Sequence, residues 1–154
     1  MAAAAAAAAA SHLRLAVCGL HLRGQPLNWQ LTDLNATFVR ACRSAAAYRV
    51  YAFTDAAGKT KPGMVRVAEG EPGGDFLLEL WDVPLESFGR FILQVPAPLG
   101  IGTVELDDGA QEKGFICEAW VAEAARRGSP RVADITALGS WPAYMEQRAQ
   151  AQQL

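Results

Sequence analysis

Short stretches of alternating apolar and polar residues, separated by turn-forming residues, constrain the fold of this chain most strongly. Leu13, Leu15 and Val17 alternate with residues of the opposite face, which is the two-residue period of a half-buried strand. Further strands are expected at residues 37–41, 48–53, 64–67, 76–83, 103–106 and 114–121. Residues 107–109, Asp-Asp-Gly, are a hairpin turn signal, and polar residues 54–62 are expected to form another hairpin loop. Strands joined mainly by hairpins predict a largely antiparallel sheet or small barrel.

Two segments change to a helical period. Apolar residues recur at three- and four-residue steps through residues 84–94, where Pro84 stands at a helix start and Pro96 is expected to end the helix. Ser140 is expected to cap a second helix near the C-terminus. Residues 31–43 also allow a helix by propensity, as an alternative to the strand at 37–41. The predicted class is therefore α+β, with a central and a C-terminal helix around the sheet.

The length of 154 residues indicates one domain. Residues 1–12 are expected to be a disordered alanine-rich tail, residues 13–146 the domain, and residues 147–154 a polar, frayed tail. The net charge of −2 gives no electrostatic footprint for nucleic acid or an anionic membrane. No apolar stretch reaches the roughly 18 residues that a membrane span requires.

The cysteines and histidines argue against a metal or cofactor site. Cys18, Cys42 and Cys117 show no CxxC spacing, and their odd number together with the lack of a signal peptide indicates a reducing cytoplasm. His12 and His21 are the only histidines, so no HExxH motif or Cys/His cluster exists. The cysteines lie in apolar runs and are expected to be small buried hydrophobes.

The loop after the first strand is the main candidate for chemistry. His21 is the natural acid–base residue there, because its ordinary pKa is near neutrality. The pocket around it is expected to use Gly19, Leu20, Arg23, Gln25, Asn28 and Gln30. Gly19 and Gly24 allow positive φ, which lets backbone amides face a ligand, and Arg23 suits a carboxylate. The alternative is a plain turn, in which His21 bonds the backbone and Asn28 closes the loop.

A second candidate is the segment of residues 96–102, PAPLGIG, with the threonine that follows it. Its prolines fix the backbone and its glycines leave open space, so Pro98, Gly100 and Thr103 are expected to form a pocket wall. The alternative is a rigid connector between a helix and a strand.

Five blocks of this sequence, in order, resemble the C-terminal domain of allophanate hydrolase, here as a free-standing chain. The blocks are residues 18–31 (CGLHLRGQPLNWQL), 48–53 (YRVYAF), 88–106 (FGRFILQVPAPLGIGTVEL), 113–119 (KGFICEA) and 133–145 (ADITALGSWPAYM). The resemblance implies a γ-glutamylcyclotransferase-like fold. In that wider superfamily a glutamate after the central helix acts as general base, but the corresponding segment here holds no acid, so cyclotransferase activity is not expected.

The resemblance also implies a place in urea and allophanate breakdown. The amidase part of allophanate hydrolases uses a Ser-Ser-Lys triad, and this chain has no GGSSGS-like segment for it. One expectation is therefore decarboxylation of N-carboxycarbamate, with His21 as the acid–base residue and a small ureido or carbamate acid as ligand. The other is a non-catalytic module that binds a separate amidase subunit, with a homodimer as a further possibility.

Overall fold

The strands form two open sheets in this computed structural model, which describes residues 10–154. The larger sheet has the order β2 (Thr37–Arg43), β5 (Leu77–Pro84), β1 (His12–Val17), β7 (Gln111–Cys117) and β6 (Leu99–Glu105). The smaller has the order β4 (Thr60–Arg66), β3 (Tyr48–Thr54) and β8 (Val132–Asp134). All neighbouring strands run antiparallel except β1 and β7. The α+β class with mostly antiparallel strands is thus confirmed, as open sheets rather than a closed barrel.

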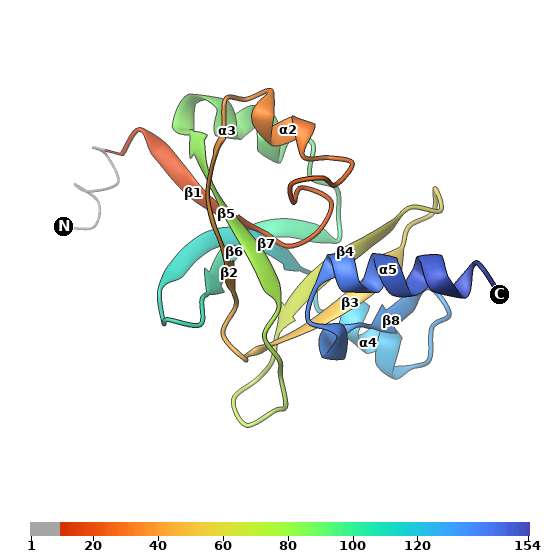
Figure 1. The fold of residues 1–154 in the computed structure, drawn as a ribbon. Coiled ribbons are helices and arrows are strands. Elements are labelled where there is room, and N and C mark those ends of the chain that lie inside the picture. The colour runs from red at the N-terminus through yellow and green to blue at the C-terminus, as the bar shows by residue number, and fades with distance from the viewer. Residues whose placement is uncertain (1–9) are drawn as a thin grey trace.

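The helices lie at two ends of the molecule (Figure 1). Helices α2 (Trp29–Thr32) and α3 (Leu85–Ile92) lie together at one end of the larger sheet, and α3 packs on β5 and β1. Helix α4 (Trp120–Arg126) packs on β3 and β8 of the smaller sheet. A 3₁₀ turn, η1 (Thr136–Leu138), leads into α5 (Trp141–Ala151). None of the helices in the described chain is long and apolar enough to cross a bilayer.

Two apolar clusters hold these layers together. The larger one joins the inward faces of β1 and β5 to Phe91 of α3 and to Trp141 of α5. The smaller one contains Tyr51, Phe53, Cys117 and Val121, where β3, β7 and α4 meet. Strand β7 contributes to both clusters, through Phe115 in the larger and Cys117 in the smaller.

The predicted helices form where their period indicates. The central one is α3, which ends at Ile92, before the proline that was expected to stop it. The terminal one is α5, whose N-cap Ser140 Oγ accepts a hydrogen bond from Ala143 N at 3.1 Å. This helix continues to Ala151, past residue 147, where the frayed tail was expected. Residues 1–9 of the expected N-terminal tail lie outside the described residues, and His12 already belongs to β1.

The strand expected at 37–41 is confirmed as β2, and the alternative helix over residues 31–43 does not form: α2 ends at Thr32, and β2 begins at Thr37 because its residues pair with β5. Two other local expectations are wrong. The loop expected at 54–62 is shorter, because residues 60–62 already pair with β3 as the start of β4. The strand expected at 114–121 stops at Cys117, and the alanine-rich residues after it form α4, in keeping with the high helix propensity of alanine.

Candidate functional site

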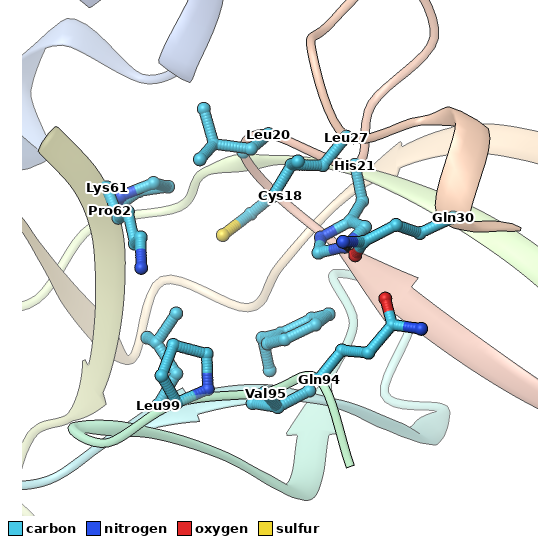
Figure 2. A pocket seen from close by; sticks show the side chains of 13 residues that line it. Cys18, Leu20, His21, Leu27, Gln30, Lys61, Pro62, Gln94, Val95 and Leu99 are labelled. Atoms are coloured by element: carbon cyan, nitrogen blue, oxygen red, sulfur yellow. Dashed lines mark hydrogen bonds between the residues drawn. The ribbon is translucent and has the colours of Figure 1, made fainter. Parts of the chain in front are cut away.

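A small cavity lies where the loop after β1 meets β4 and the chain that follows α3 (Figure 2). It is lined by Cys18, Gly19, Leu20, His21, Leu27, Gln30, Lys61, Pro62, Gln94, Val95, Pro96, Leu99 and Phe115. Its volume is about 50 Å³. A single water needs ~10–15 Å³ on this scale, so the cavity suits a ligand of a few non-hydrogen atoms.

His21 stands in the wall of this cavity in a fixed orientation. Its Nε2 lies 2.8 Å from Gln30 Oε1, and its ring stacks on Phe115 at a centroid distance of 5.1 Å. The Phe91 ring makes a T-shaped contact with the imidazole, with ring centroids 5.2 Å apart. Two aromatic neighbours and one hydrogen bond therefore hold the imidazole in place.

The surroundings of His21 also determine its protonation. Burial lowers the pKa of His21, and the hydrogen bond to Gln30 offsets part of that effect. The ring is therefore neutral at neutral pH. Because a carbonyl oxygen only accepts, Nε2 carries the hydrogen and donates it to Gln30 Oε1, which leaves Nδ1 with a lone pair.

The rest of the loop is braced by its own hydrogen bonds. Asn28 Nδ2 donates to the carbonyl oxygen of His21 at 2.8 Å, and Leu27 N donates to Leu20 O at 2.9 Å. Asn28, which was expected to contact a ligand, is not among the cavity-lining residues and instead fixes the main chain of His21.

Arg23 does not line the cavity, contrary to the expectation that it holds a ligand carboxylate there. Its main-chain N and its Nε both donate to the Glu79 carboxylate at 2.9 Å, and its guanidinium lies 3.6 Å from the centre of the Phe38 ring. Trp81 Nε1 also donates to Glu79, at 3.3 Å. The buried carboxylate of Glu79 therefore links the loop to β5 and neutralises the charge of Arg23. Gln25 is half-buried and likewise lies away from the cavity.

The pocket wall that was expected at residues 96–103 forms only in part. Pro96 and Leu99 line the cavity, whereas Pro98, Gly100 and Thr103 do not. The reason is that residues 99–102 are not a loop: β6 begins at Leu99 and pairs with β7. Alternate residues of a strand face opposite sides, so Gly100 turns away from the face of Leu99.

The two loop glycines serve different purposes. Gly24 takes a positive φ of +79°, as predicted, but lies away from the cavity. Gly19 has no positive φ, and the expectation that it does is wrong. A Cβ atom on Gly19 would lie 2.2 Å from Pro62 Cγ, so glycine is needed there for a close approach between the loop and β4.

Lys61, Pro62, Gln94, Val95 and Phe115 also line the cavity and were not predicted from the sequence. No local signal marks them, because β4, β7 and the chain after α3 reach the loop after β1 only in the folded chain. The Lys61 side chain is 14% exposed, and its Nζ lies 3.4 Å from Asp55 Oδ2. Among residues 10–154, no group of three or more His, Cys, Asp or Glu side chains is placed to hold a metal ion.

Comparison with known proteins identifies the family. The model of the allophanate hydrolase C-terminal domain matches residues 13–146. Urea amidolyase of Saccharomyces cerevisiae is 43% identical over 134 residues, which cover 87% of this chain but 7% of that protein. The chain therefore spans less than a tenth of this curated relative.

Solved structures agree with the match. Kluyveromyces lactis allophanate hydrolase superposes with a TM-score of 0.79 at 40% identity, over 88% of this chain and 21% of that one. The Escherichia coli protein c4763 gives a TM-score of 0.75 at 35% identity, over 89% of this chain and 98% of that one. These matches agree with the α+β class and the mostly antiparallel strands of the fold. The chain belongs to the allophanate hydrolase C-terminal domain family.

Proposed function

We propose that this chain binds a small carbamate-type acid in the cavity beside His21 and promotes the loss of carbon dioxide from N-carboxycarbamate. The observation that carries the proposal is the setting of His21: one ring nitrogen is bound to Gln30, and the ring lines a cavity of about 50 Å³. Membership in the allophanate hydrolase C-terminal domain family and similarity to urea amidolyase support a role in allophanate and urea chemistry.

The reaction needs one proton and one broken bond. In N-carboxycarbamate, the bond between nitrogen and one carboxylate carbon breaks, its electron pair stays on nitrogen, and a proton is added there. The products are carbon dioxide and carbamate. Well-placed proton transfer of this kind typically contributes ~100- to 10,000-fold to a rate, so one histidine is a sufficient catalyst.

The proton cycle of His21 follows from its environment. Without a ligand, burial keeps the ring neutral by lowering its pKa. A bound anion raises the pKa of a neighbouring histidine, because the opposite charge favours the imidazolium form. His21 then takes a proton from solvent and delivers it through Nδ1 to the ligand nitrogen, while Nε2 remains bonded to Gln30.

The test supplies N-carboxycarbamate continuously with an amidase acting on ¹³C-labelled allophanate, and follows its lifetime by stopped-flow NMR. The wild-type chain is expected to shorten that lifetime, and His21→Ala to abolish the acceleration. His12→Ala is the matched control, because His12 is an exposed histidine outside the cavity. An unchanged rate in a folded His21→Ala protein would overturn the proposal.

The second candidate function is a binding module for a separate amidase subunit. It is favoured by apolar side chains that face solvent at the end where α2 and α3 lie: Trp29 is 54% exposed and Leu93 is 86% exposed. A stable complex with a purified amidase, weakened by Leu93→Ser, is expected from this function. Light scattering that shows no complex at micromolar concentrations would count against it.

A further inference from the structure

Among residues 10–154, the lining of the cavity carries a single fixed charge. Of these lining residues, His21 is neutral and Lys61 is the only other ionisable base. No aspartate or glutamate of the described chain belongs to the lining. Most of the remaining wall is apolar, so the field of the lysine is weakly screened there. The interior of the cavity therefore favours an anion.

Lys61 is held at this wall by a loose ion pair. Its Nζ lies 3.4 Å from Asp55 Oδ2, whereas strong charge-assisted hydrogen bonds between these groups span ~2.7–2.9 Å. Asp55 Oδ1 accepts hydrogen bonds from Ala57 N and Lys59 N, both at 2.9 Å. The hairpin turn thus fixes the carboxylate, and an ammonium group with three donors keeps hydrogen-bonding capacity for a ligand.

The polar groups face one another across the cavity. Figure 2 shows Lys61 and Pro62 on one side, and His21 and Gln30 on another. His21 occupies Gln30 Oε1, so the amide nitrogen of Gln30 remains as a donor. A ligand that spans this gap therefore meets a cation at one end and an imidazole with an amide at the other.

We propose that Lys61 binds the carboxylate of the ligand, and that the cavity selects short acids whose second, nitrogen-bearing group reaches His21 and Gln30. This inference rests on the proposed function and adds the residue that recognises the charge. From the sequence, Arg23 was expected to bind the ligand carboxylate. Because Glu79 neutralises the charge of Arg23 outside the cavity, Lys61 binds the carboxylate instead.

Malonate is the probe, because its methylene group replaces the nitrogen of N-carboxycarbamate and it does not lose carbon dioxide under assay conditions. Malonamide has the same size without charge. Lys61→Met is expected to weaken malonate binding roughly 10- to 100-fold by calorimetry, the range for losing a buried hydrogen bond to a charged group. Malonamide binding should be weak and equal in both proteins.

Lys59→Met is the matched control, since Lys59 is an exposed lysine of the same hairpin that does not line the cavity. It is expected to bind malonate within about twofold of the wild-type chain, as a screened surface charge should. Lys61→Gln serves as a second uncharged variant should Lys61→Met fail to fold. Malonate binding that is unchanged in a folded uncharged variant, or absent in the wild-type chain, overturns the inference.

The two proposals fail separately. Normal turnover in His21→Ala overturns the proposed decarboxylation, whatever Lys61→Met binds. Malonate binding that is lost in Lys59→Met as well as in Lys61→Met overturns the specific role of Lys61, even with His21-dependent turnover intact.

Discussion

A single missing side chain, at Gly19, allows the loop that carries His21 to lie against β4. A Cβ atom there would lie 2.2 Å from Pro62 Cγ and 2.7 Å from Pro62 Cδ, and the proline ring is too rigid to move aside. The cavity is lined by both residues, so its shape depends on this contact.

We therefore expect Gly19→Ala to destabilise the fold by about 1–3 kcal/mol, the usual cost of overpacking, and to weaken malonate binding. Gly100→Ala is the control, because a Cβ atom on Gly100 meets nothing within 4 Å and its φ is not positive. That variant should change stability by no more than ~0.5 kcal/mol. Urea denaturation measures the free energy of unfolding of both variants. Equal changes in that free energy would show that the close approach to Pro62 does not make residue 19 require glycine.

At the residue scale the sequence predicted part of the cavity. His21, Gly19, Leu20 and Gln30 line it as expected, because they lie close together on one loop. Arg23 instead pairs with the carboxylate of Glu79, which lies 56 positions further along the chain. No local sequence pattern predicts a pairing over that distance. The chemical role of His21 stays a prediction until its variant is assayed.

Among the helices and strands, α3 is the element whose place in the chain the sequence predicted most closely. Its apolar residues keep a helical period, and Phe91 from this helix packs edge-on against the His21 ring. Gly89 is an interior position of the helix, and a Cβ atom there meets nothing within 4 Å.

Gly89→Ala should therefore stabilise the chain by about 0.5–1 kcal/mol, because alanine loses less backbone entropy than glycine when a helix forms. Thermal unfolding is expected to move to higher temperature, with malonate affinity unchanged. A lower melting temperature would mean that the outer face of α3 has a contact that the structure does not show.

The elements that were predicted wrongly share one physical cause. The segment at 96–102 has the prolines and glycines of a loop, yet residues 99–102 become strand because β7 offers them a partner. The strand was expected to continue through residues 118–121, yet it ends at Cys117 because α4 packs Val121 into the smaller cluster. Partners from elsewhere in the chain override local preference in both cases.

At the scale of the whole molecule, the two sheets meet around two buried thiols. Cys18 lines the cavity at the end of β1, and Cys117 lies where a Cβ atom on Gly63 of β4 would come within 2.6 Å of its sulfur. Burial raises the pKa of both Cys18 and Cys117 to about 12. Both thiols are therefore protonated and unreactive at neutral pH.

These thiols predict how stability changes at alkaline pH. Well below pH 9, the ordinary pKa of a thiol, both the folded and unfolded chains keep the thiol protons. Between pH 9 and about 12 only the unfolded chain releases them, because the folded pKa is near 12, so stability falls as pH rises. The slope should approach ~1.4 kcal/mol per pH unit for each thiol.

Guanidinium denaturation across this range is the measurement. Cys18→Ala is expected to flatten the slope, whereas Cys42→Ala, which removes a half-buried thiol on the edge strand β2, should flatten it less. Equal slopes in all three proteins would show that Cys18 ionises as readily in the folded chain as in the unfolded one.

Local chemistry in the sequence determined the alternating strands, the helix periods, the Ser140 cap and the place of His21 on its loop, because each depends on residues close together in the chain. Only the tertiary structure decided what surrounds His21. Phe115 comes from β7, and Lys61 and Pro62 come from β4. These strands reach the loop because segments far apart in the chain pair and bury their side chains together. A local sequence pattern does not predict such long-range contacts.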